Sequence, residues 1–262
     1  MLSEALITRT AVAPVMAEPD TRAEQVTQLV LGETARMLGE KGEWRKLRAD
    51  ADHYEGWVHS GYILPGSTVH AEAWQRSASG WSEGAVGHVD DARISLPLRA
   101  RVGLEDRAVR LPDGRLAAVV VGSVRNYNEV TAAAKAVAPH EWAWAHYAGA
   151  PYEWGGITPW GVDCSGLVQT TWLARGVRLP RDAKLQVDVG DVIAPGAMRP
   201  GDLLFFRGVE TDRITHVALS AGGDSIVHST IACGGVVREP WGPGTRAAPL
   251  RERLVAVRRV AW

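Results

Sequence analysis

One cysteine of this chain, Cys164, stands in a sequence context that suits nucleophilic chemistry. It follows Asp163 and precedes Ser165 and Gly166, and an apolar pattern with helical spacing begins directly behind it. A cysteine in the first turn of a helix lies beside unpaired backbone N–H groups and the positive end of the helix dipole, which favour the reactive thiolate. The alternative interpretation is a small buried core residue. The sequence favours the nucleophile, because histidines that can complete a catalytic set follow downstream.

Two of these histidines, His216 and His228, lie in short β-rich segments, residues 215–220 and 225–229. The turn signal Ala-Gly-Gly-Asp at 221–224 separates the segments, so the pattern predicts a β-hairpin. With Gly222 at the centre of the turn, His216 is expected directly opposite His228, with Cβ atoms about 4.5–5.5 Å apart. One histidine then acts as base and the other orients it. A slip by one residue would place the rings on opposite faces.

Further motifs surround these three residues in a fixed order. They are Pro-Tyr-x-Trp-Gly-Gly at 151–156, Asp-Cys-Ser-Gly-Leu-Val at 163–168, Leu-Pro-Arg-Asp at 179–182 with Gln186, Arg-Pro-Gly-Asp-Leu-Leu-Phe-Phe at 199–206, Thr-His-Val at 215–217 and His-Ser at 228–229. Through these motifs, residues 130–262 resemble the NlpC-type family of bacterial cell-wall cysteine peptidases. The resemblance implies an α+β, papain-like catalytic domain with helices followed by an antiparallel sheet.

The resemblance also implies roles and a substrate class. Cys164 is the implied nucleophile, His216 the base and His228 the residue that orients the base. The implied substrate is the peptide stem of peptidoglycan, cut between γ-D-glutamate and a diamino acid, either meso-diaminopimelate or lysine. His216 is then expected to hold Cys164 as a thiolate–imidazolium pair and to protonate the leaving amine.

Three residues near the nucleophile, and the backbone N–H of the nucleophile itself, are candidates for binding the oxyanion or the substrate. The backbone N–H of Cys164 is one candidate oxyanion donor, and by resemblance the Tyr152 hydroxyl is another. Asp163 and Ser165 correspond to residues that contact substrate in similar enzymes; an N-cap and first-turn pair is the alternative interpretation. Tyr152 and Trp154 are alternatively core aromatics.

Other polar residues of this half are predicted to be architectural. Arg181 is expected to be a solvated loop charge, with a contact to a substrate carboxylate as the alternative. Gln186 is expected in a helix-end hydrogen bond, with an approach to the site as the alternative. Cys233 lies in a Gly-flanked turn without a base and is expected to be a free, non-catalytic thiol. The two cysteines and eight histidines show no ligand-spaced cluster, so no metal and no cofactor is predicted.

The first half of the chain has short β-rich segments separated by turns, a pattern typical of small barrels. Residues 1–65 resemble a bacterial SH3 domain through Gly32, Trp44 and the Gly-Trp pair at 56–57. Residues 66–127 are predicted to form a second, more diverged SH3-like β domain. The catalytic domain is then expected over 128–262, beginning with an Ala-rich helix at 129–137.

One acidic residue of the first barrel is a candidate for substrate recognition. In some members of the family the first SH3 domain packs over the active site and recognises the free amine of an N-terminal L-alanine. Glu55, beside the Gly-Trp pair, is the predicted ammonium partner. An ordinary exposed charge is the alternative interpretation.

Composition narrows the function classes further. A net charge of −1 without a basic stripe argues against nucleic acid. No segment approaches the ~18 apolar residues of a membrane span, and no secretory signal pattern is seen. We therefore expect a cytoplasmic enzyme of murein recycling that trims freed stem peptides, or an exported protein if the sequence is truncated. The alternatives are an exported hydrolase acting on intact peptidoglycan, a Cys-His acyltransferase or transamidase, and a non-catalytic wall-binding protein.

Overall fold

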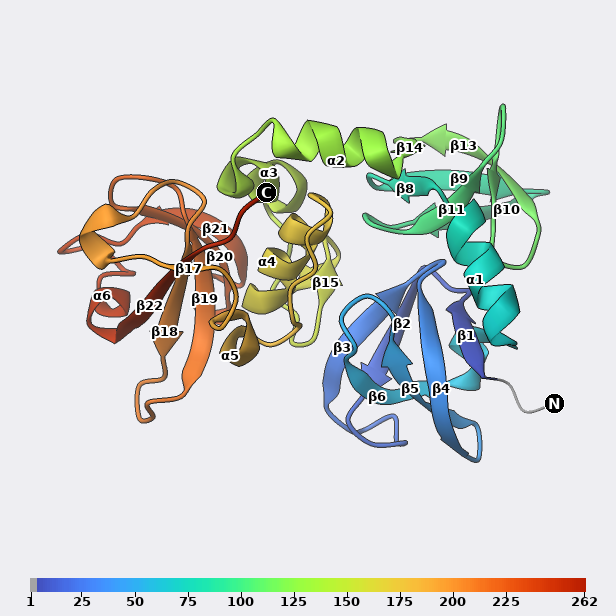
Figure 1. The fold of residues 1–262 in the computed structure, drawn as a ribbon, viewed down its shortest axis with the longest axis horizontal. Helices are drawn as coiled ribbons and strands as arrows, with labels where there is room; N and C mark the ends of the chain where they lie inside the picture. The colour runs from blue at the N-terminus through green and yellow to red at the C-terminus, as the bar shows by residue number, and fades with distance from the viewer. Residues whose placement is uncertain (1–3) are drawn as a thin grey trace. The chain divides into compact units, whose positions relative to one another are not determined.

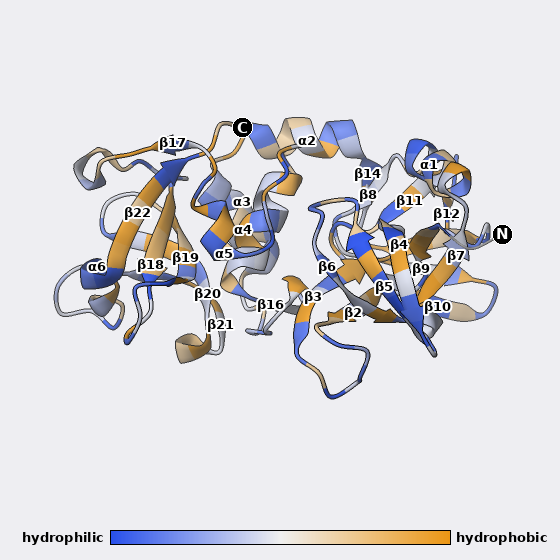
Figure 2. Cartoon of the chain, turned by 60° about the horizontal axis from the view of Figure 1, so that its bottom comes forward, coloured by the Kyte–Doolittle hydropathy of each residue, from blue (hydrophilic) through white to orange (hydrophobic). Residues whose placement is uncertain are grey.

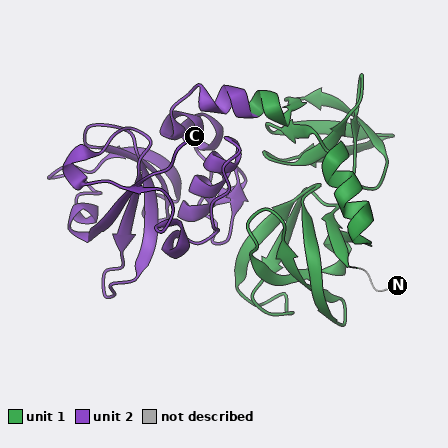
Figure 3. Ribbon diagram, in the orientation of Figure 1, with its two compact units in different colours: residues 1–130 green, residues 131–262 purple. Residues whose placement is uncertain are grey.

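Two compact units make up the computed structural model, which describes residues 4–262 (Figure 3). Unit 1 comprises residues 1–130 and unit 2 residues 131–262. Their boundary lies inside helix α2 (Tyr127–Lys135), which begins two residues before the predicted start of the Ala-rich helix. The boundary between units therefore falls three residues later than the domain boundary predicted at 127/128. No helix within residues 4–262 has the length and apolarity to span a bilayer.

The first sheet of unit 1 is seven-stranded, in the order β3-β2-β6-β5-β4-β1-β7, and every pair in it is antiparallel. Its strands are β1 (Ala5–Thr8), β2 (Val12–Met16), β3 (Gln25–Val30), β4 (Thr34–Lys41), β5 (Trp44–Ala49), β6 (Glu55–His59) and β7 (Ile63–Gly66). Buried side chains on one side of these short strands form the core of this sheet, among them Leu6, Val15, Leu29, Leu47 and Val58. These strands lie within the segment predicted as the first barrel, residues 1–65, except that β7 extends one residue beyond it.

The second sheet of unit 1 follows helix α1 (Thr68–Ser77) and has the order β10-β9-β13-β12-β11-β8-β14. Its strands are β8 (Gly80–Ser82), β9 (Ala85–Val89), β10 (Ala92–Leu96), β11 (Arg101–Leu104), β12 (Val109–Arg110), β13 (Leu116–Val121) and β14 (Val124–Asn126). They lie within the segment predicted as a second barrel. Whether this sheet is a diverged SH3 domain stays a prediction.

The two sheets of unit 1 are joined by buried polar contacts. Glu33 and Arg99 form an ion pair in which Nε and Oε1 are 2.9 Å apart, and both side chains are buried. Gly32 has φ +79°, and a Cβ there would lie 1.9 Å from the carbonyl oxygen of Arg101. The motif glycine is therefore required both by its backbone conformation and by this close approach.

Unit 2 is an α+β domain, as predicted, with a six-stranded antiparallel sheet in the order β17-β22-β18-β19-β20-β21 (Figure 1). The strands are β17 (Asp191–Val192), β18 (Leu203–Arg207), β19 (Ile214–Ser220), β20 (Ser225–Thr230), β21 (Gly235–Pro240) and β22 (Leu254–Arg259). The helices are α3 (Pro139–Tyr147), α4 (Cys164–Leu173), α5 (Ala183–Gln186) and α6 (Pro249–Arg253), and β15 (Ile157–Thr158) pairs with β16 (Gly161–Val162).

The central strands of this sheet are buried on both faces. Residues 203–206 of β18 are all fully buried, and Figure 2 shows β18 and β22 as strongly hydrophobic strands. Helix α4 packs on β19 and β20. Phe206, Ala218 and Ile226 pack with Trp241 and Leu250, the latter from α6. The sheet thus carries the histidine strands, and α4 brings the cysteine to them.

Candidate active site

Cys164 is the first residue of α4, as the sequence predicted. Asp163 is the N-cap, and its carboxylate accepts a hydrogen bond of 2.7 Å from the backbone N–H of Gly166. The side chain of Cys164 is 7% exposed. A capped helix start fixes the direction of the first turn, so the sulfur is held at the end of the helix where backbone donors are unpaired.

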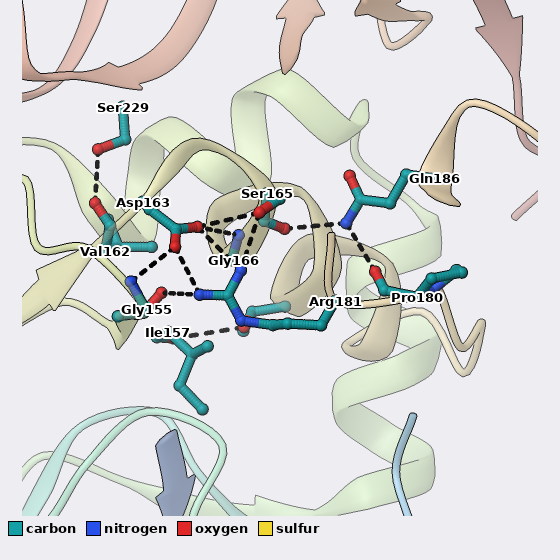
Figure 4. A network of polar contacts seen from close by, with 12 residues as sticks. Gly155, Ile157, Val162, Asp163, Ser165, Gly166, Pro180, Arg181, Gln186 and Ser229 are labelled. Atoms are coloured by element: carbon teal, nitrogen blue, oxygen red, sulfur yellow. Dashed lines mark hydrogen bonds and ion pairs between the residues drawn. The ribbon is translucent and has the colours of Figure 1, made fainter. Parts of the chain in front are cut away.

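A buried ion pair holds this helix start in place (Figure 4). Arg181, 2% exposed, reaches Asp163 through two hydrogen bonds of 3.0 and 2.6 Å, and Ser165 through a third of 2.8 Å. The backbone N–H of Gly155 also donates to Asp163, at 2.9 Å. The expectation that Arg181 is a solvated loop charge is therefore wrong, because its guanidinium is the buried partner of the N-cap carboxylate.

These contacts show that Asp163 and Ser165 form the N-cap and first-turn pair, which was the alternative interpretation of the two residues. Their role in binding substrate stays a prediction. Gln186, at the end of α5, donates from its amide nitrogen to the carbonyl of Ser165 at 3.0 Å and to that of Pro180 at 2.8 Å (Figure 4). Gly166 is required here, since a Cβ on it would lie 2.2 Å from the carbonyl oxygen of Gly156. The two glycine-containing motifs are thus neighbours in space.

The predicted hairpin forms, but with a different register. Strands β19 and β20 pair at Leu219–Val227 and Ser220–Ile226, which centres the turn on Gly223 rather than Gly222. His216 is therefore not directly opposite His228 but diagonal to it, displaced by two residues. An even displacement keeps both side chains on one face. The rings still meet, with His216 Nε2 and His228 Nδ1 2.7 Å apart.

A third residue, Glu239, extends this pair and was missed from the sequence. Glu239 lies on β21, opposite Ile226, and its Oε1 is 2.7 Å from His228 Nε2. A carboxylate only accepts hydrogen bonds, so His228 Nε2 carries the proton, and His228 Nδ1 accepts from His216 Nε2–H. His216 Nδ1 is then the unprotonated ring nitrogen, and its role as the base stays a prediction. The alternation of inward and outward side chains along β21 could have indicated Glu239, but only if the pairing of β21 with β20 had been known.

Arg246 completes the chain of contacts by binding the Glu239 carboxylate through both oxygens. Burial lowers the pKa of His228, while Glu239 works in the opposite direction. Burial lowers the pKa of His216 well below its usual value, and His228, Arg253 and Arg246 lower it further. His216 is therefore neutral in the resting site and ready to accept a proton.

The Cys164 sulfur lies against the backbone of β19 at Val217, the residue after His216. The N–H groups of Val217 and Ser165 interact with the sulfur. Within residues 4–262 no hydrogen bond joins the sulfur to His216 itself. Catalytic hydrogen bonds are often loose before substrate binds. The paired residues of β19 and β20 end at Leu219 and Val227, so the ladder does not include His216 or His228. Cys164 contacts β19 in the part that is not paired with β20, at Val217.

The protonation of Cys164 differs from the expectation. Burial raises the pKa of the thiol to about 12, and the Asp163 carboxylate raises it further. Together with the lowered pKa of His216, this favours a neutral thiol and a neutral imidazole at rest rather than a thiolate–imidazolium pair. Burial outweighs the backbone donors around the sulfur in its effect on this pKa.

Tyr152 lies close to the nucleophile. Burial raises the pKa of its hydroxyl, and Cys164 raises it further, so the hydroxyl remains protonated and able to donate. Its backbone N–H bonds to Gly234, next to β21. Trp154 of the same motif is 58% exposed, so its interpretation as a core aromatic is wrong. The role of Tyr152 as oxyanion donor stays a prediction.

Two other residues singled out in the sequence lie elsewhere. Cys233 is exposed and free, in the short 3-10 turn after β20. Glu55, on β6 of unit 1, is exposed and forms ion pairs with Arg48 at 2.7 Å and Lys46 at 3.7 Å. Arg48 lowers the pKa of this carboxylate. Its charge is already compensated, and its role as an ammonium partner stays a prediction.

The first barrel also carries a concave, partly aromatic surface. A cavity of about 540 Å³ is lined by side chains that include Trp44, His59 and Tyr62. The rings of Trp44 and His59 meet edge to face, with centroids 5.5 Å apart. Trp44 therefore lines a groove on this barrel.

Two protein-family models match separate parts of the chain. Residues 149–251 match the NlpC/P60 family, and residues 15–62 match the bacterial dipeptidyl-peptidase Sh3 domain. The first match contains all three candidate catalytic residues, and the second covers most of the first sheet of unit 1.

Curated and solved proteins resemble the chain over most of its length. The gamma-D-glutamyl-L-lysine dipeptidyl-peptidase of Bacillus subtilis is 28% identical over 78% of this chain and 71% of its own. Dipeptidyl-peptidase 6 of Lysinibacillus sphaericus is 27% identical over 84% and 85%. The crystal structure of an NlpC/P60 family protein from Bacillus cereus superposes with a TM-score of 0.78 at 19% identity, covering 98% of this chain and 99% of that one. The chain is thus a cysteine peptidase whose residues 149–251 belong to the NlpC/P60 family, with a bacterial SH3 domain ahead of them.

Proposed function

We propose that this peptidase hydrolyses the bond between γ-D-glutamate and the diamino acid of peptidoglycan stem peptides that carry a free N-terminal L-alanine. The main support is the chain Glu239–His228–His216 beside the capped helix start of Cys164. The similarity to a gamma-D-glutamyl-L-lysine dipeptidyl-peptidase over most of both chains supports the bond that is cut. Lysine or meso-diaminopimelate is the proposed diamino acid.

Acylation begins with the neutral thiol. As Cys164 sulfur attacks the γ-carbonyl carbon of D-glutamate, His216 Nδ1 takes the thiol proton, so that no thiolate stands in the buried resting site. The oxyanion receives hydrogen bonds from the backbone N–H of Cys164 and from the Tyr152 hydroxyl. The positive charge that forms on His216 is shared through His228 with the Glu239 carboxylate.

The carbon–nitrogen bond then breaks, and His216 returns its proton to the amine of the departing diamino acid. L-Ala-γ-D-Glu remains bound to Cys164 as a thioester. Water attacks this thioester while His216 accepts the water proton, and the dipeptide leaves with a free γ-carboxylate. His216 returns this proton to the departing Cys164 sulfur, so each cycle consumes one water, restores the thiol and needs no cofactor.

Mass spectrometry of the products tests the proposal. The purified protein is incubated with free L-Ala-γ-D-Glu-meso-diaminopimelate, with the lysine tripeptide, and with N-acetylmuramoyl forms of both. We expect L-Ala-γ-D-Glu from the free peptides only, and none from Cys164→Ala. Cleavage of the muramoyl peptides as well would indicate a wall-remodelling hydrolase instead. If the wild-type protein cut none of them, the proposed bond would be wrong.

A further inference from the structure

A cavity of about 240 Å³ lies beside the histidine pair in unit 2. It extends from His216 and His228 to α6 and the loop before it. Two arginines line it, Arg246 and Arg253, together with the apolar residues Ala247, Pro249 and Leu250. A small concave site with apolar walls and a few fixed charges is typical of a ligand subsite.

Arg253 differs from the arginines around it in having no counter-ion. Arg246 pairs with Glu239, and Arg251 pairs with Asp224. Arg253 forms no ion pair or side-chain hydrogen bond within residues 4–262 and is only partly exposed. A guanidinium that is partly withdrawn from water without a carboxylate is well placed to bind an anion bidentately.

The sheet places Arg253 close to the base. Leu254, the next residue, opens β22 and pairs with Phe206 of β18. Phe206 in turn pairs with His216. Arg253 also lies near enough to His216 to lower the pKa of its ring. Arg253 and His216, the proposed base, therefore line one cavity.

We propose that this cavity binds a carboxylate of the departing diamino acid, with Arg253 as its main partner. The inference rests on the proposed function. His216 protonates the leaving amine, so the diamino acid must lie against that ring, where the cavity begins. Its α-carboxylate is two bonds from the amine nitrogen, and meso-diaminopimelate has a second carboxylate at the end of its side chain. Either carboxylate, the α-carboxylate or the one on the side chain, can form the same ion pair with the guanidinium.

Steady-state kinetics with three peptides tests this subsite. They are L-Ala-γ-D-Glu-L-Lys, its C-terminal amide, and L-Ala-γ-D-Glu-meso-diaminopimelate. We expect Arg253→Ala to lower kcat/KM for the free lysine acid by about tenfold, the size expected of one charge-assisted hydrogen bond, and to leave the amide nearly unchanged. Arg253→Lys should recover part of the loss because it keeps the charge.

Arg238 supplies the matched control. It lies on β21 beside Glu239, carries the same charge, and forms an exposed pair with Glu141 at 3.3 Å without lining the cavity. Arg238→Ala should leave the ratio of kcat/KM for the acid to kcat/KM for the amide unchanged.

The pattern of losses identifies the carboxylate that binds. If the variant Arg253→Ala affects only the diaminopimelate peptide, the side-chain carboxylate is the one bound. An equal fall for all three peptides overturns the proposal.

Product binding tests the subsite independently of the reaction. Free L-lysine, L-lysinamide and meso-diaminopimelate are titrated by NMR into Cys164→Ala and into Cys164→Ala combined with Arg253→Ala. A preference for an acid over the amide that disappears in the double variant supports the subsite, even if the wild-type protein cuts none of the tripeptides and the proposed function fails. Equal binding of acids and amide, or none, overturns it.

Discussion

At the scale of single residues, the tautomer of His216 depends on the residues that contact His228. Glu239 fixes the proton of His228 on Nε2, which makes His228 Nδ1 an acceptor and leaves His216 Nδ1 free for the thiol. Arg246 neutralises the carboxylate that would otherwise favour protonation of His228. We therefore expect Glu239 to act through His228 as a positioning residue.

Replacing Glu239 should separate this positioning role from a purely structural one. We expect Glu239→Ala to lower kcat/KM by at least about tenfold, because His228 loses the acceptor that fixes its tautomer. Arg246, left without its partner, should lower the pKa of His216 further, so the acid limb of the pH profile moves to lower pH. Glu239→Gln keeps an acceptor oxygen and should recover most of the rate. Loss of rate with an unmoved acid limb, and no recovery in the Gln variant, would speak for structural damage alone.

At the scale of elements, the start of α4 is anchored by a residue outside the helix. Arg181 satisfies the N-cap carboxylate and the Ser165 hydroxyl while itself almost fully buried. Removing one partner of a buried ion pair leaves an uncompensated charge, whereas an exposed pair contributes little. Asp182 and Lys184, a short distance along the chain, form such an exposed pair at 3.3 Å.

The two pairs provide a direct comparison of stability. Arg181→Met should lower the free energy of unfolding by about 3–5 kcal/mol, because the Asp163 carboxylate is left buried and unpaired. Lys184→Met should change it by less than about 1 kcal/mol. Chemical denaturation followed by tryptophan fluorescence measures both. Equal stability of the two variants would mean that water or another group compensates Asp163.

At the scale of the whole molecule, buried neutral histidines link folding to pH. Burial lowers the pKa values of His140 and His228, which are 4% and 1% exposed. In the unfolded chain both titrate near their usual pKa of about 6.5. Below that pH the unfolded state binds protons that the folded state does not, so stability is present above pH ~6.5 and is lost as the pH falls.

Denaturation at several pH values should reveal this linkage. Between about pH 6.5 and 5, above the range in which carboxylates titrate, the free energy of unfolding should fall by up to about 1.4 kcal/mol per pH unit for each histidine. His140→Leu, which lies outside the active site, should have a shallower slope than the wild-type protein. A slope that is identical in both proteins would show that His140 does not carry the effect.

The sequence by itself determined the features that depend on neighbours along the chain. Asp163 before Cys164 is a capping pattern, and it produced a helix that begins where predicted. Turn signals around Gly222 and Gly223 produced the hairpin, and an even spacing kept His216 and His228 on one face despite the shifted register. The motif order likewise sufficed for the α+β fold, because caps, turns and strand alternation act over a few residues.

Only the tertiary structure decided which distant groups meet. The sequence predicts a surface charge at Arg181, because nothing near it along the chain shows that its guanidinium binds the carboxylate of Asp163, 18 positions away. Glu239 became the partner of His228 through the pairing of β21 with β20, and Arg253 reached the base through strands β22 and β18. Burial raises the pKa of Cys164 against the effect of the helix dipole. Partner choice and desolvation are properties of packing, which no short stretch of sequence encodes.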